Sequence, residues 1–211
     1  FKVEQEGILD PGVSDVPNFY ASNLLFDAAG RCVLLGWARG FAKGRGWNGT
    51  LALPRILTIG DDGHPRQQTH PELEQLRGKW VNFGSQSVYG YGELSQSFPN
   101  ASIEVDAVIK LNGKSEAGIR LNGKRLVRYE SSGKLTVAGT EVALPASTDG
   151  KVSLRVFIDR SVIEVFANDG SVVVTRLIDG APGRCDLQVY ADGQSCQVER
   201  LKAWEMKSIW G

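Results

Sequence analysis

Apolar and polar positions alternate along much of this chain. Residues 152–158 show the pattern clearly, and so do Val172 and Val174 beside Arg176. Successive side chains of a strand point to opposite faces, so this period predicts strands with one face on a core. The longest alternating run carries apolar residues at Ile103, Val105, Ala107, Ile109 and Leu111.

Turn-forming dipeptides separate these runs at short intervals. Asn-Gly and Asp-Gly tolerate the left-handed backbone that tight hairpins need, so each pair predicts a turn between strands. Many short strands at this spacing predict an all-β fold and favour a β-sandwich of antiparallel hairpins. The pairs are Asp62-Gly63, Asn112-Gly113, Asn122-Gly123, Asp149-Gly150, Asp169-Gly170, Asp179-Gly180 and Asp192-Gly193.

One short segment has a helical pattern. Pro71 suits a first helical turn, Leu73 and Leu76 are three residues apart, and Gly78 is expected to stop the helix after Arg77. We expect this connector to divide the chain into residues 1–77 and 78–211. The first part offers only two or three strands, around Tyr20 to Phe26 and Cys32 to Trp37, which is too little area for a core, so something else should cover it.

Composition excludes several function classes. Lys plus Arg equals Asp plus Glu at 24 each among 211 residues, so no charge excess points to nucleic acid or an anionic membrane, and no apolar run is long enough to span a bilayer. Three scattered cysteines do not make a structural zinc site. Cys185 and Cys196 could pair across a hairpin, although buried free thiols are the simpler interpretation. We expect no metal and no cofactor.

Candidate catalytic groups are sparse. Asp10, Asp15 and Asp27 are the aspartates of the aromatic-rich segment before Asp61, and each is explained as a loop or turn residue beside Pro or Gly. Retaining glycosidases need two carboxyl groups about 5 to 5.5 Å apart, one ionised and one protonated, and no such pair is evident. The two histidines precede prolines in polar loops, and no Gly-x-Ser-x-Gly elbow is present. No residue is assigned a catalytic role.

Several motifs together resemble one enzyme family. The segment Asp159 to Gly170, which opens Asp-Arg-Ser and continues Glu-Val-Phe, resembles the signature of the C-terminal β-sandwich in family 32 of the glycoside hydrolases, the invertases, inulinases and levanases. Further similar motifs precede it in the family's order. They are Asn18-Phe19-Tyr20-Ala21 with Phe26-Asp27, Gly30-Arg31 with Leu35-Gly36-Trp37, Gly46-Trp47 with Leu53-Pro54-Arg55, and Glu72-Leu73 with Leu76-Arg77.

The resemblance implies a fold and a function for the whole protein. Residues 1–77 would be the last blade of a five-bladed catalytic β-propeller with its linker, and residues 78–211 the sandwich. The protein would hydrolyse β-fructofuranosides, such as sucrose, inulin or levan, with retention. The family's Trp-x-Asn-Asp-Pro-Asn-Gly, Arg-Asp-Pro and Glu-Cys-Pro type motifs do not occur here. We therefore expect the catalytic carboxylates on an upstream propeller segment or a complementing chain, and no hydrolysis by this chain alone.

Two aromatic residues are candidates for sugar contact. The family's Gly-Trp tryptophan lies close to its fructose pocket, which makes Trp37 a candidate, and Tyr20 matches the family's Tyr-Ala tyrosine. Packing within the blade is the alternative for both, and Trp47, Trp80, Trp204 and Trp210 are expected in the core or between domains. A fructose-containing oligo- or polysaccharide is the expected partner. A different class of function also stays open, namely a stand-alone carbohydrate-binding or structural β-sandwich without hydrolase activity.

Glu164 is expected to lie away from the sandwich core. It alternates with Ile163 and Val165, so its side chain points to the opposite face. That position suits a contact with solvent or with an interface, and does not suit acid/base catalysis.

Overall fold

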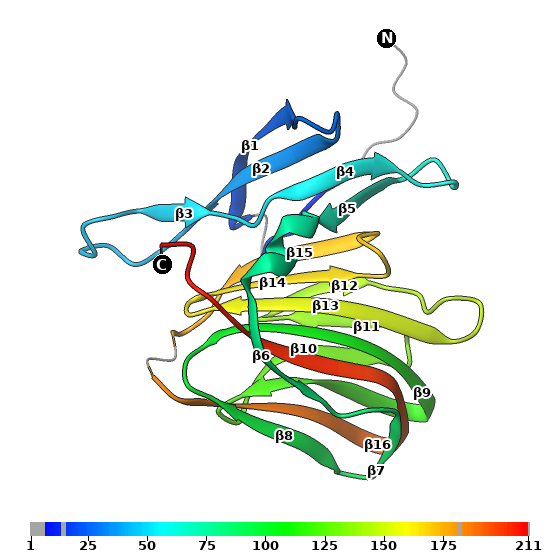
Figure 1. The fold of residues 1–211 in the computed structure, drawn as a ribbon. Helices are drawn as coiled ribbons and strands as arrows, with labels where there is room; N and C mark the ends of the chain where they lie inside the picture. The colour runs from blue at the N-terminus through cyan, green and yellow to red at the C-terminus, as the bar shows by residue number, and fades with distance from the viewer. Residues whose placement is uncertain (1–6, 14–15, 181–182, 211) are drawn as a thin grey trace.

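The computed structural model describes residues 7–13, 16–180 and 183–210, and nearly all of its regular structure is antiparallel β-sheet. A small sheet lies above a large one (Figure 1). The small sheet has the order β1-β2-β4-β5, with β3 paired to β2. Its strands are β1 (Phe19–Phe26), β2 (Cys32–Arg39), β3 (Gly49–Leu51), β4 (Arg55–Ile59) and β5 (Pro65–Thr69).

The large sheet folds back over itself and encloses the main core. Two long strands, β9 and β16, pair along most of their length and link the strands on both sides of that core. This arrangement confirms the predicted all-β, sandwich-like fold. The strands are β6 (Arg77–Asn82), β7 (Gln86–Tyr89), β8 (Glu93–Phe98), β9 (Ser102–Leu121), β10 (Lys124–Glu130), β11 (Lys134–Val137), β12 (Thr140–Ala143), β13 (Lys151–Asp159), β14 (Val162–Ala167), β15 (Val172–Leu177) and β16 (Cys185–Met206).

The predicted alternation is present in the strands at the centre of the large sheet. Ile103 and Val105 of β9 pair with Ile158 and Val156 of β13, and all four side chains are buried in the main core. Each buried aliphatic side chain of this size contributes about 1.5–3 kcal/mol relative to its exposed state. The hydrophobic effect therefore fixes the register of these strands, because a shift by one residue would expose the whole set.

Two of the predicted turns are wrong. Asn122-Gly123 does form the β9–β10 hairpin, with both residues at positive φ. Asn112-Gly113 and Asp192-Gly193 instead lie inside β9 and β16. The Ser115 hydroxyl accepts hydrogen bonds from the backbone N–H groups of Gln194 and Ser195, at the register shift between Gly193 and Ser195. Glycine here serves a bulge that keeps the two strands paired.

The connector is a 3₁₀-helix, η1 (Pro71–Leu76), which confirms a short helical link. Gly78 does not stop it, because the helix ends at Leu76 and Gly78 lies within β6. A side chain at Gly78 would begin 3.1 Å from the carbonyl oxygen of Glu205 on β16, so glycine permits close approach of these two strands. No helix in the described ranges is long and apolar enough to cross a membrane.

Candidate functional site

The two sequence-predicted sugar-contact residues lie side by side on the small sheet. Tyr20 on β1 pairs with Trp37 on β2, and their ring centroids are 6.4 Å apart. The Arg39 guanidinium stacks over the Tyr20 ring at 3.8 Å. Trp37 lies against Gly49 of β3, where a Cβ atom would fall 1.6 Å from its indole nitrogen. Tyr20 is 47% exposed and Trp37 is half-buried, so the pair presents a partly open aromatic surface.

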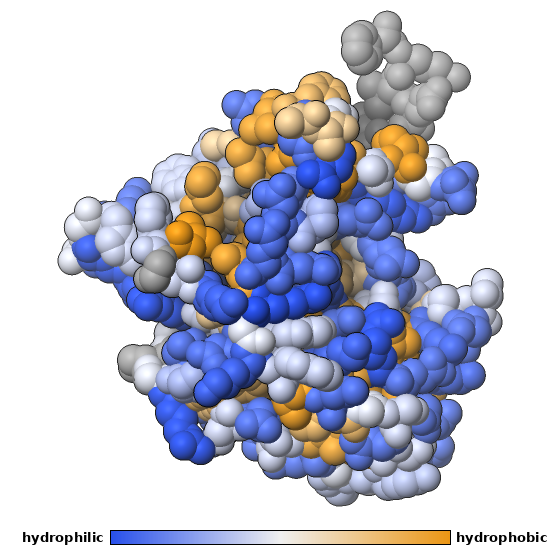
Figure 2. Space-filling model, in the orientation of Figure 1, coloured by the Kyte–Doolittle hydropathy of each residue, from blue (hydrophilic) through white to orange (hydrophobic). Residues whose placement is uncertain are grey.

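Strand β1 exposes apolar side chains on both of its faces. Leu24, Leu25 and Phe26 are consecutive, so they point alternately to opposite sides of the sheet, yet all three are exposed, Phe26 by 75%. Figure 2 shows apolar side chains gathered over the top of the molecule, where Figure 1 places β1. Contiguous exposed apolar surface marks an interaction site.

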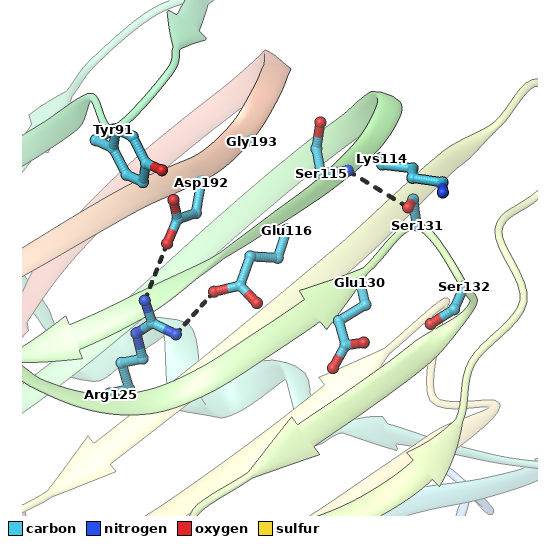
Figure 3. Close-up of a pocket in the computed structure, with 10 residues that line it drawn as sticks. All are labelled: Tyr91, Lys114, Ser115, Glu116, Arg125, Glu130, Ser131, Ser132, Asp192 and Gly193. Atoms are coloured by element: carbon cyan, nitrogen blue, oxygen red, sulfur yellow. Dashed lines mark hydrogen bonds and ion pairs between the residues drawn. The ribbon is translucent and has the colours of Figure 1, made fainter.

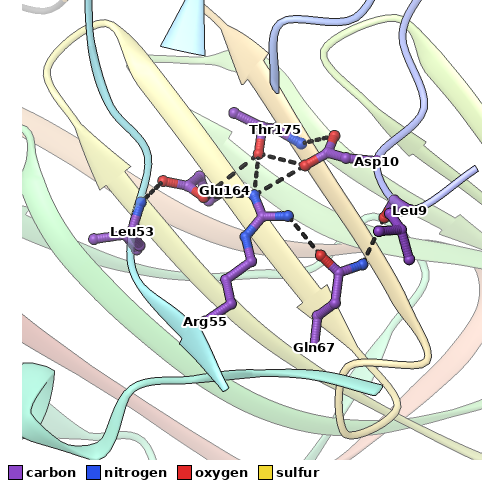
Figure 4. A network of polar contacts seen from close by, with 7 residues as sticks. All are labelled: Leu9, Asp10, Leu53, Arg55, Gln67, Glu164 and Thr175. Atoms are coloured by element: carbon purple, nitrogen blue, oxygen red, sulfur yellow. Dashed lines mark hydrogen bonds and ion pairs between the residues drawn. The ribbon is translucent and has the colours of Figure 1, made fainter. Parts of the chain in front are cut away.

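A buried polar cluster joins the small sheet to the large one (Figure 4). One guanidinium nitrogen of Arg55 on β4, Nη2, lies 2.9 Å from a carboxylate oxygen of Asp10 and 2.9 Å from one of Glu164 on β14. The same nitrogen lies 2.6 Å from the Thr175 hydroxyl on β15, and Nη1 donates to the Gln67 side chain at 2.8 Å. Asp10 and Glu164 are buried, and Arg55 has no exposed surface at all.

Burial dominates the electrostatics of this cluster. Removal from water raises the pKa of both Asp10 and Glu164, against the lowering effect of Arg55. The backbone N–H of Leu53 donates to Glu164 and that of Thr175 donates to Asp10, so each carboxyl group is also tied to a strand. A substrate cannot reach either carboxyl group, because both are enclosed between the sheets. The cluster is a structural junction.

The structure gives a separate outcome for each acid discussed from the sequence. The interpretation of Asp10 as an ordinary loop residue is wrong, because the small sheet and β15 enclose it. Asp27 is a turn residue as expected: it accepts the N–H groups of Ala29 and Arg31, and the Arg31 bonds lower its pKa to about 2. Asp15 lies outside the described residues. Glu164 makes the expected interface contact and does not face solvent.

A second polar cluster fixes the linker. Glu104 on β9 is fully buried and accepts two bonds from Arg77, at 2.7 and 2.9 Å, and one from Arg155 on β13 at 2.7 Å. Leu73 of η1 packs beside it against Phe157, Phe166 and Val173 of the large sheet. Buried charges are stable only when they are paired and hydrogen-bonded, and here they are. The two clusters and this apolar patch hold the sheets in one arrangement.

A pocket on the large sheet is lined with charged side chains (Figure 3). It has a volume of about 420 Å³. Arg125 pairs with Glu116 at 2.8 Å and with Asp192 at 3.0 Å, while Glu130 pairs with Arg128 at 2.9 Å. These groups neutralise one another in an open, solvated groove. Each of these acids is held in an ion pair, so none is left free to act as an acid or base on a substrate.

The cysteines and most of the tryptophans lie in different environments, the former mainly buried and the latter mainly exposed. All three cysteines are free, so the Cys185–Cys196 pairing is excluded in favour of buried thiols. Trp47, Trp80 and Trp210 are 49%, 58% and 89% exposed, so they are not core residues, and a position between domains stays a prediction for them. Trp204 is half-buried beneath the Arg77 guanidinium. Within residues 7–13, 16–180 and 183–210, no three His, Cys, Asp or Glu side chains are grouped to bind a metal.

Comparison with known proteins identifies the family. The sequence profile described as glycosyl hydrolases family 32 C terminal matches residues 72–205, and the chain belongs to that family. It is 31% identical to a levanase of Bacillus subtilis over 78% of this chain and 28% of the levanase. It is 25% identical to a sucrose-6-phosphate hydrolase of Escherichia coli, over 90% of this chain and 42% of that enzyme.

Solved structures share the fold. An exo-inulinase from Aspergillus awamori superposes with a TM-score of 0.76 and 20% identity, over 96% of this chain and 45% of the inulinase. Fructan 1-exohydrolase IIa from Cichorium intybus gives a TM-score of 0.71 and 22% identity, over 92% of this chain and 49% of that enzyme. One structure of the latter protein holds 1-kestose. The chain thus spans less than half the length of these relatives.

Proposed function

We propose that this chain is the C-terminal part of a retaining β-fructofuranosidase that acts on sucrose, inulin or levan, with the catalytic carboxylates supplied by an upstream segment or a second chain. Family membership and the partial coverage of levanases, inulinases and invertase-like hydrolases support this assignment. The chain on its own is inactive in this proposal. Its role is to complete and support the catalytic part.

The observation on which this proposal rests is the exposure of β1. A strand with apolar side chains bare on both faces is unfavourable in water and belongs between two other layers. Leu24 and Leu25 are 53% and 44% exposed on opposite faces of the same sheet. Neighbouring propeller blades would cover both faces at once. Residues 1–77 would then be the last blade with its linker, and residues 78–211 the sandwich domain.

The described acids support the absence of catalysis from this chain. Retaining hydrolysis needs two carboxyl groups about 5 to 5.5 Å apart that open onto the sugar. Among residues 7–13, 16–180 and 183–210, the close Asp10 and Glu164 pair is enclosed and shares the Arg55 guanidinium. An acid held in this way cannot attack an anomeric carbon or protonate a leaving group.

Tyr20 and Trp37 are the proposed substrate-side residues. Flat aromatic rings stack on the apolar faces of sugars, and these two rings adjoin the bare surface on which the catalytic segment would dock. Arg39, stacked on Tyr20, adds N–H donors for sugar hydroxyls. The pair would line the edge of the cleft, outside the reacting centre.

Two assays of released fructose test the proposal. The pure chain should release none from sucrose, inulin or levan. A chimera in which this chain replaces the matching C-terminal part of the Bacillus subtilis levanase should release fructose from levan. In that chimera, Trp37→Ala should lower the rate of fructose release more than Trp47→Ala does. Fructose release by the chain alone, abolished by Asp10→Asn, would refute the proposal.

A stand-alone carbohydrate-binding module is the second candidate, and the partly open Tyr20 and Trp37 pair favours it. Calorimetric titration with fructo-oligosaccharides separates the two. Clear binding by the isolated chain, abolished by Trp37→Ala and retained in Trp47→Ala, would support a module. Absence of binding by the chain, together with an active chimera, would support the first proposal.

A further inference from the structure

The junction between the sheets contains two carboxyl groups for one guanidinium. Asp10, Glu164 and Arg55 are buried, and the Phe19 ring covers the guanidinium at 4.0 Å. With both carboxyl groups ionised, the cluster would hold one uncompensated negative charge in an apolar interior, which is strongly unfavourable. Binding of one proton removes that charge.

The geometry also gives such a proton a place. Asp10 Oδ2 and Glu164 Oε2 each lie 2.9 Å from the same nitrogen of Arg55, and both contact the Thr175 hydroxyl, at 2.7 and 3.4 Å. Two acids that share one cation titrate as a coupled pair, and burial raises the pKa of both. The remaining oxygens, Asp10 Oδ1 and Glu164 Oε1, are occupied by the N–H groups of Thr175 and Leu53.

The charged groups around the pair are few. Arg55 of β4 faces both acids, and Arg176 of β15 acts on Asp10 from a greater distance, without an ion pair to it. Burial lowers the pKa of Arg176. Gln67 and Thr175, the other side chains in contact, carry no charge. Arg55 is thus the one cation within 4 Å of the acids in the described part of the chain.

We propose that Asp10, Arg55 and Glu164 form a proton-linked clamp, in which one proton shared by the two carboxyl groups holds the small sheet on the large one. This clamp concerns the coupling of the two sheets and does not depend on the proposed hydrolase function. Asp10 precedes β1, Arg55 lies in β4 and Glu164 lies in β14, so the clamp ties three distant segments together. The orientation of the β1 surface relative to the large sheet follows from it.

The pH dependence has a definite sign. Burial raises the pKa of both acids, so the folded chain binds the proton more tightly than the unfolded chain. The stabilisation is therefore complete below the unfolded carboxyl pKa of about 4 and is lost as the pH rises through the raised value. The clamp is firmer in acid than at neutral pH.

Thermal unfolding of matched variants tests the clamp. Glu164→Gln keeps the shape and cannot ionise, whereas Glu141→Gln removes an exposed carboxyl group of the large sheet as a control. Between pH 5 and pH 8 the wild type should lose roughly 3 °C or more relative to Glu164→Gln. The Glu141→Gln variant should follow the wild type. Parallel pH profiles of wild type and Glu164→Gln would overturn the proposal.

Hydrogen exchange in the wild-type chain gives a test that does not require a variant to fold. The amides of Leu53 and Thr175 bind the two acids, while the amide of Ala52 binds the carbonyl of Gly36. After correction for intrinsic rates, protection at Leu53 and Thr175 should fall more than at Ala52 between pH 5 and pH 8. Equal changes at the three amides would refute the clamp.

Discussion

The two sheets of this chain differ in how much of their apolar surface they bury. The large sheet folds over its own apolar face, and its inward side chains, such as Leu135 and Ile163, have no exposed surface. The small sheet has a cluster of only Phe19, Leu34 and Ala52, and it leaves Leu24, Leu25 and Phe26 of β1 exposed. A sheet with so little core depends on what it contacts. The large sheet thus encloses its own core, whereas the small sheet leaves apolar side chains exposed.

Replacement of Arg55 should have the largest effect on stability. Arg55→Met leaves two buried carboxyl groups without a cation, and removal of one partner from a buried pair costs about 3–5 kcal/mol. Chemical denaturation measures the loss. The triple variant, which combines Arg55→Met with Asp10→Asn and Glu164→Gln, should be more stable than Arg55→Met alone. A triple variant that is less stable would show that the charges do not govern the junction.

Truncation of an apolar side chain compares the two sheets directly. Leu135→Ala in the main core should lower the free energy of unfolding by about 3 kcal/mol, because a cavity replaces buried area. Leu24→Ala on β1 should change it by less than about 0.5 kcal/mol, because this side chain is already in water. Urea denaturation of both variants checks the difference. Equal losses would mean that β1 is covered within this chain.

The sequence predicted the core of the large sheet well and the polar junction between the two sheets poorly. Apolar and polar side chains alternate with a period of two residues in β9 and β13, so the face that each strand turns to the core could be predicted. The junction joins Asp10 to Thr175 and Arg55 to Glu164 across more than a hundred residues, and no local pattern encodes that pairing. One signal was present: Val165 and Phe166 are adjacent and apolar, which indicates a strand buried on both faces. Glu164 within such a strand had to be paired.

A substitution at Gly49 probes the aromatic pair. A Cβ atom in Gly49→Ala would fall 1.6 Å from the Trp37 indole, so the ring must move, at a cost of about 1–3 kcal/mol. Gly180→Ala is the control, since its nearest neighbour would be an ordinary contact at 3.7 Å. Denaturation followed by tryptophan fluorescence measures both. A neutral Gly49→Ala would mean that the Trp37 side chain is free to turn outward.

Replacement of Asp27 should have the smallest effect on stability. The pH dependence of that effect should have the opposite sign to that of the clamp. Its lowered pKa, about 2, means that its stabilisation is present above the unfolded value near 4 and is lost as the pH falls toward 2. Asp27→Asn should flatten the stability profile in that window. Thermal midpoints at pH 2, 3 and 4 provide the check, and an unchanged slope would contradict the assignment.

Hydrogen exchange of β1 tests the central claim most directly. In the proposed function, the exposed faces of β1 are docking surfaces for an upstream catalytic part. In the chimera with the levanase, the β1 amides should exchange at least about ten times more slowly than in the isolated chain, while those of β13 stay unchanged. Equal exchange of β1 in the isolated chain and in an active chimera would contradict the claim.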